Sequence, residues 1–135
     1  MICVLAAGKT ATFAAAAFTL AWTHSVEKTR WEERWTGGPN GLRVVEGRVE
    51  GSGAGMEPPP DAVLEEGAYV YRPTLAPIPE LVLAASGATG GGWTFCASGD
   101  PCVTLGAARG DPVRIRWCDA PAPAASSDER PSRSP

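Results

Sequence analysis

An alternation of apolar and polar residues with a period of two constrains the fold of this chain more than any other feature. The alternating positions of its clearest stretch are Phe18, Leu20, Trp22, His24 and Val26. A period of two is typical of a β-strand with one buried face. Four alanines at 14 to 17 would favour a helix locally, but the β-branched and aromatic residues after them favour a strand. The pattern predicts one strand from Phe13 to Val26.

The residues that follow can return as a second strand. Glu27-Lys-Thr29 offers a polar turn, and Arg30 to Thr36 places Trp31, Glu33 and Trp35 on one side. A hairpin with His24 near its bend is the simplest arrangement.

The rest of the chain is a series of short strands between turns. Gly37 to Gly41 is a dense turn signal, and Leu42 to Glu50 alternates with one slip in register, which predicts a β-bulge. Gly51 to Pro60 is expected to be a long loop. Further short apolar runs are 2–6, 68–72, 80–85, 92–97, 102–105 and 112–118. We therefore expect an all-β fold, a single small antiparallel barrel or sandwich.

The chain of 135 residues has room for one domain. We assign residues 1–118 to this all-β domain, because the composition from 119 to 135 collapses to Ala, Pro, Ser and charged residues, which predicts a disordered tail. The net charge is −3, with ten Arg and two Lys, and this balance argues against a nucleic-acid partner.

A twelve-residue apolar stretch, Ala11 to Trp22, is too short to span a bilayer as a helix. We expect no transmembrane segment. It also lacks the positive region that begins a secretory signal, because Met1 to Gly8 is itself apolar. The sequence as written therefore predicts a cytoplasmic protein.

Four cysteines, Cys3, Cys96, Cys102 and Cys118, allow three complete pairings. Cys96 and Cys102 flank a turn-forming insert that would bring two adjacent strands within disulfide range. Cys3 and Cys118 lie near the two ends of the domain, and pairing of the terminal strands would place them together. The alternative is reduced, buried thiols in the cytoplasm.

Several residues could support chemistry: His24, Ser25, Glu27, Glu32, Glu33 and Glu57. Ser25 is a poor nucleophile candidate, because adjacent strand residues point to opposite faces and His24 cannot activate it. One His with scattered Glu matches no standard metal-ligand spacing, so we expect no metal and no cofactor. A purely structural interpretation has His24 and Ser25 bonding the hairpin bend and Glu27 to Glu33 lining a solvated face.

The competing interpretation is a binding patch for a partner protein or a small ligand. Trp22, Trp31 and Trp35 would be its aromatic anchors. In the Gly51 to Gly55 stretch, Gly53 and Gly55 could present backbone N–H groups to an anion, but the Gly-Lys-Ser/Thr ending of a phosphate loop is missing and Glu57 would repel an anion. An Ω-like surface loop is the alternative.

Three stretches carry a family resemblance: Trp22 to Glu33, Gly51 to Pro60, and Phe95-Cys96 with Cys102. They resemble a small bacterial and archaeal family of unknown function, domain-of-unknown-function family 1850. Its members are typically encoded beside TAXI-type tripartite (TRAP) transporters, which move small organic anions across the inner membrane. Many relatives carry an N-terminal anchor or export signal, so the resemblance implies a periplasmic or inner-membrane-associated location as the alternative.

Together these features predict a non-enzymatic accessory or binding protein of a TAXI-type TRAP transporter, whose partners are transporter subunits or a small organic anion. The alternative is a small enzyme or a metal- or ligand-binding domain that uses His24 with Glu27 or Glu57. Convergence of these side chains in one pocket would favour the alternative.

Overall fold

The computed structural model describes residues 1–23, 29–50, 62–85 and 92–118, and this part of the chain is all β. Its strands are β1 (Ile2–Ala6), β2 (Lys9–Phe13), β3 (Ala17–Thr23), β4 (Arg30–Gly38), β5 (Gly41–Glu50), β6 (Val63–Glu65), β7 (Ala68–Tyr71), β8 (Leu81–Leu83), β9 (Trp93–Ala97), β10 (Val103–Leu105) and β11 (Val113–Trp117). No helix in the described ranges is long and apolar enough to cross a membrane.

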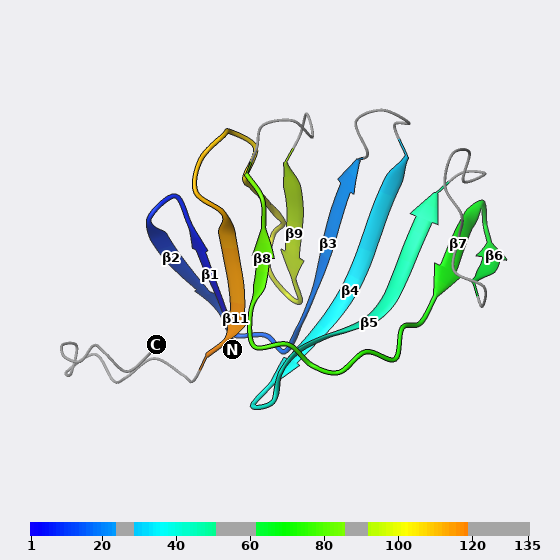
Figure 1. Cartoon of the computed structure of the whole chain (residues 1–135), viewed down its shortest axis with the longest axis horizontal. Helices are drawn as coiled ribbons and strands as arrows, with labels where there is room; N and C mark the ends of the chain where they lie inside the picture. The colour runs from blue at the N-terminus through cyan, green and yellow to red at the C-terminus, as the bar shows by residue number, and fades with distance from the viewer. Residues whose placement is uncertain (24–28, 51–61, 86–91, 119–135) are drawn as a thin grey trace.

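The strands form two antiparallel sheets. The small sheet has the order β2-β1-β11-β8, and the large sheet has the order β10-β9-β3-β4-β5-β7-β6. In Figure 1 the small sheet lies at the left, whereas β5, β7 and β6 extend to the right beyond it. The all-β prediction is confirmed. Of the two predicted alternatives, a barrel or a sandwich, the described residues form two sheets and no closed barrel.

The hydrophobic core lies between the small sheet and the β9-β3-β4-β5 part of the large sheet. Its buried members are Ile2, Val4, Phe18, Leu20, Trp35, Leu42, Val44, Leu83, Phe95, Ala97, Val113 and Ile115. Alternation explains this set, because every second residue of each strand points to the same face. Gly37 lies where the sheets approach closely, and a Cβ there would come within 2.9 Å of the Trp117 ring.

A β-bulge interrupts the pairing of β4 with β5. Arg34 pairs with Glu46, whereas the next residue, Trp35, pairs with Val44, so Val45 is an extra residue on β5. The slip in alternation between Val44 and Val49 predicted this irregularity, and the structure confirms it. The bulge returns the apolar residues after it to the inner face of the sheet.

The long strand expected from Phe13 to Val26 is wrong at its start. Phe13 ends β2, which pairs with β1, and the chain bends over 14–16 before β3 begins in the other sheet. Strands β2 and β6 were not predicted. Each forms a tight hairpin whose two turn residues have positive φ, at Ala7-Gly8 and Glu66-Gly67, as a type I′ turn requires.

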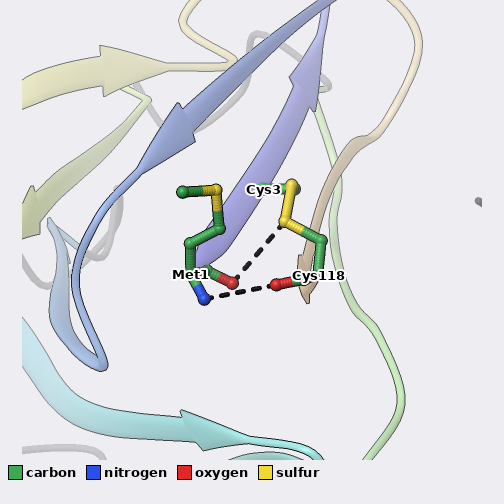
Figure 2. The surroundings of a disulfide bond; sticks show 3 residues. All are labelled: Met1, Cys3 and Cys118. Atoms are coloured by element: carbon green, nitrogen blue, oxygen red, sulfur yellow. Dashed lines mark hydrogen bonds between the residues drawn. A yellow bond between two sulfur atoms is a disulfide. The ribbon is translucent and has the colours of Figure 1, made fainter. Parts of the chain in front are cut away.

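The cysteines form two disulfides. Cys96 and Cys102 face each other across the β9-β10 hairpin with Cα atoms 4.2 Å apart, and Cys3 joins Cys118 across 5.9 Å. Figure 2 shows the second bond, next to Met1, whose N-terminal ammonium donates a 3.2 Å hydrogen bond to the Cys118 carbonyl. Both pairings predicted from the sequence are present: β9 pairs with β10, and the terminal strands β1 and β11 pair with each other.

Candidate functional site

Four partly buried side chains lie together on the inner face of the large sheet, at the edge of the hydrophobic core. We call Trp22, Trp31, Glu33 and Tyr71 the aromatic face. Trp22 on β3 is the cross-strand partner of Trp31 on β4. Glu33 follows two residues after Trp31 and therefore points to the same side. Because Gly47 on β5 pairs with both Glu33 and Tyr71, the Tyr71 ring joins the same face.

Trp22 and Trp31 stack on each other. Their ring centroids are 6.1 Å apart and the planes differ by only 7°. Trp22 also packs against Trp93, which anchors it to the core. The Nε1 atom of Trp31 is buried and, among the described residues, has no hydrogen-bond partner. The exposed part of Trp31 is therefore ring carbon.

Glu33 is the acidic group of the aromatic face. It is half-buried, and its Oε1 accepts a 3.0 Å hydrogen bond from Trp35 Nε1. Burial raises the pKa of the Glu33 carboxyl above 4.5, and the Trp35 hydrogen bond opposes part of that rise. Glu33 therefore does not line a solvated face, contrary to the structural interpretation of the Glu27 to Glu33 segment.

Tyr71 closes the face on the β7 side. Its ring lies over Gly47, where any side chain would overlap it, so the missing Cβ makes room for the phenol. Burial raises the pKa of Tyr71, and the negative charge of Glu33 raises it further. Tyr71 therefore remains a neutral hydroxyl that can donate or accept a hydrogen bond beside the carboxylate.

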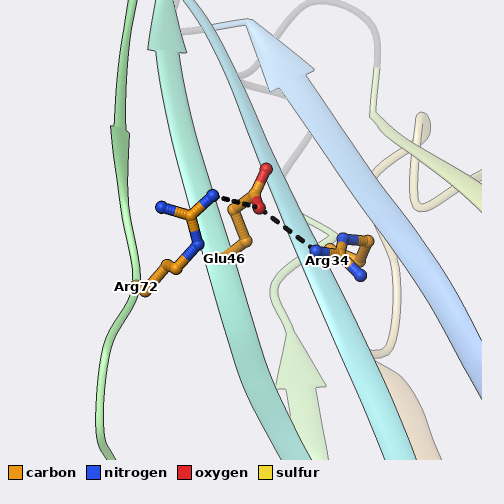
Figure 3. Close-up of polar contacts among 3 residues, drawn as sticks. All are labelled: Arg34, Glu46 and Arg72. Atoms are coloured by element: carbon orange, nitrogen blue, oxygen red, sulfur yellow. Dashed lines mark hydrogen bonds and ion pairs between the residues drawn. The ribbon is translucent and has the colours of Figure 1, made fainter. Parts of the chain in front are cut away.

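The outer face of the same strands carries charge of both signs. Figure 3 shows Glu46 between Arg34 and Arg72, at N–O distances of 3.1 and 3.5 Å. A shallow hollow of about 310 Å³ on this face is lined by Thr19, Glu32, Arg34, Glu46 and Arg48. Because adjacent strand residues point in opposite directions, Glu32 lies in this hollow and Glu33 does not.

The structure thus brings together three of the candidate site residues, Trp22, Trp31 and Glu33, and separates Glu32 from them. Trp35 is largely buried in the core and serves as the donor to Glu33. The remaining candidates lie outside the described residues: His24, Ser25, Glu27, Gly53, Gly55 and Glu57. Strands β3 and β4, which precede and follow His24, Ser25 and Glu27 in the sequence, pair with each other as the predicted hairpin requires.

Tyr71 was not predicted as a member of the site. The alternation of Tyr69 and Tyr71 around Val70 places them on one face of a strand, but only the register of β7 against β5 places Tyr71 beside Glu33. In the described ranges, no group of three or more His, Cys, Asp or Glu side chains is arranged to hold a metal ion.

Comparison with known proteins gives one match. A family described as "Domain of unknown function (DUF1850)" matches residues 18–105, which include β3 from its second residue, β4 to β10, and the aromatic face. No curated protein and no solved structure shows significant similarity to the chain. Since the match covers more than half of the sequence, the chain belongs to the DUF1850 family.

Proposed function

We propose that the protein is a non-enzymatic accessory module of a TAXI-type TRAP transporter for small organic anions, and that the aromatic face is its contact surface for a transporter subunit. The transporter part of the proposal draws on the family resemblance, whose members are typically encoded beside such transporters. The binding part draws on the side chains of the large sheet.

The observation that carries the binding part is a half-buried carboxylate among partly exposed rings. Trp and Tyr are enriched among residues that dominate binding energies at protein interfaces. Burial of Glu33 disfavours the charged form of its carboxyl group and therefore raises its pKa. A group whose charge is costly to the folded protein is a candidate for function, because function is a common reason for retaining such a group.

The backbone of the large sheet also supports the proposal. The aromatic face is carried by three strands, β3, β4 and β7, with β5 pairing between β4 and β7. Side chains on paired strands are held more firmly than those on loops, which reduces the entropy lost on binding.

The proposal is tested by complementation. Cells that carry the neighbouring transporter but lack this protein would be supplied with wild type, Glu33→Gln or Glu50→Gln, and uptake of the organic anion would be measured. Glu50 is exposed and lies on the outer face of β5, so its variant controls for the loss of one negative charge. We expect Glu33→Gln alone to lose uptake although its melting temperature is no lower than that of wild type. Full uptake with Glu33→Gln would contradict the contact surface.

Two further variants test residues beyond the described part of the chain. His24→Ala or Glu27→Ala should abolish support of transport with little loss of stability if these residues extend the binding surface. If they instead satisfy hydrogen bonds of the hairpin, the same changes should destabilise the fold by about 1–3 kcal/mol. A thermal melt beside the uptake assay separates the two outcomes.

A further inference from the structure

Resting on the proposed function, we infer that the aromatic face binds an arginine side chain of the partner protein, with its guanidinium stacked on Trp31 and paired with Glu33. The inference follows from three properties of the face: the exposed ring surface, the arrangement of charge, and the spacing of the two residues.

The exposed ring surface favours a cation. Trp31 stacks with Trp22 through one face of its indole and keeps Nε1 buried, so a ligand that contacts the exposed part of the ring meets carbon atoms rather than the N–H donor. A cation within about 6 Å of a Trp centroid is attracted by the ring quadrupole, more strongly once water is excluded.

The charge arrangement also favours a cation. The residues that face Glu33 from the neighbouring strands are Leu20 on β3, Gly47 on β5 and, next to Gly47, Tyr71 on β7. Of these only Tyr71 titrates, and within the described residues no Lys or Arg pairs with Glu33. The arginines of the same region, such as Arg34, lie on the outer face. Among the residues that the structure describes, the inner carboxylate of Glu33 therefore lacks a counter-ion when it is ionised.

The spacing fits arginine better than lysine. Residues two apart on a strand are separated by about 6.6 Å, so Trp31 and Glu33 present a ring and a carboxylate side by side. A planar guanidinium can stack on a ring while its edge donates to a carboxylate, whereas an ammonium is a compact point charge. Trp35 occupies Oε1 of Glu33 with one bond, and an ionised carboxylate has about four acceptor sites.

The probe for a test is the capped tripeptide acetyl-Gly-Arg-Gly-amide, and its control is the same peptide with citrulline, the neutral isostere of arginine. The side-chain N–H signals of the five tryptophans would be followed by NMR during titration, after assignment with single Trp→Phe variants. We expect saturable shifts at Trp31 and Trp22 with the arginine peptide, and at least tenfold weaker binding of the citrulline peptide.

Variants separate the binding role of Glu33 from a structural one. Glu33→Gln keeps an oxygen that can accept from Trp35, so the fold should persist while affinity for the arginine peptide falls at least tenfold. Glu50→Gln should bind as wild type does. Binding should also weaken as the pH falls through the raised pKa of Glu33, because protonation removes the charge.

Equal responses to the arginine and citrulline peptides would overturn the inference, as would wild-type affinity in Glu33→Gln or the absence of any saturable shift. These results differ from failure of the proposed function. If the titration fails but Glu33→Gln still loses transport, the face contacts the transporter by other chemistry. If the titration succeeds and uptake is normal, the face binds arginine but serves a different partner.

Discussion

The two disulfides allow a direct comparison of how chain constraint stabilises this domain. Cys3–Cys118 spans a sequence separation of 115 residues, and Cys96–Cys102 spans only 6. A cross-link removes conformational entropy from the unfolded chain in proportion to the logarithm of the closed loop. On this basis Cys3→Ala/Cys118→Ala should lower the free energy of unfolding by about 4.8 kcal/mol, and Cys96→Ala/Cys102→Ala by about 2.2 kcal/mol.

Urea denaturation of the two double variants and of oxidised wild type measures this difference. With a slope of about 2 kcal/mol per molar urea, the gap of about 2.6 kcal/mol between the variants corresponds to about 1.3 M in midpoint. Wild type treated with a reductant should approach the behaviour of the variant that lacks all four cysteines, which controls for the Ala substitutions themselves.

The order of the two effects is the decisive result. Equal midpoints, or a larger loss on removing the hairpin bond, would refute the reasoning that the unfolded chain sets the stabilisation. Such a result would mean that contacts around β9 and β10 in the folded state, not the long loop, determine the contribution of each bond. The hairpin strands are already paired over Val103 to Leu105, so their register does not require the short bond.

Three further predictions concern the faces of the large sheet. Because burial raises the pKa of Glu33 above its ordinary value, the contribution of this carboxyl to stability should be fully present at low pH and be lost as the pH rises through the raised pKa. The melting temperature of wild type relative to that of Glu33→Gln should therefore fall as the pH rises over this range. Gly47→Ala should lower the free energy of unfolding by about 1–3 kcal/mol, because the new Cβ overlaps the Tyr71 ring. Urea melts would compare it with Gly110→Ala, whose new Cβ meets no atom within 4 Å. Glu46→Gln should lower the free energy of unfolding by less than about 1 kcal/mol, because its partners Arg34 and Arg72 are exposed, and by still less in high salt. A loss of several kcal/mol in a thermal melt would contradict this expectation.

Much of the fold could be predicted because most strands bury one face. Runs such as 42–50 and 113–117 alternate in apolarity, and this alternation is imposed by the core. The strands that were missed, β2 and β6, lie at sheet edges and are almost wholly exposed, so burial imposes no pattern on them. The turns Ala7-Gly8 and Glu66-Gly67 were the sequence signal from which these two strands could have been predicted.

The candidate site was predictable only in part, for a related reason. Alternation within a strand puts Trp31 and Glu33 on one face, and hairpin pairing brings Trp22 to them. The addition of Tyr71 depends on which strands become neighbours, and that choice is made by the packing of the whole sheet rather than by any local sequence. The burial of Glu33 was likewise invisible, because a charged residue in a strand usually faces water.

The extra residue Val45 gives β5 one position at which the strand can lose a residue without changing its two faces. Trp35 pairs with Val44 and Arg34 pairs with Glu46, so deleting Val45 would leave the flanking pairs in place and convert the bulge into regular antiparallel pairing. Arg48 would stay on the outer face and Val49 on the inner face. Loss of one residue from a regularly paired strand, by contrast, moves the side chains beyond it to the opposite face. Among homologous sequences, single-residue deletions in β5 should therefore be concentrated at the bulge.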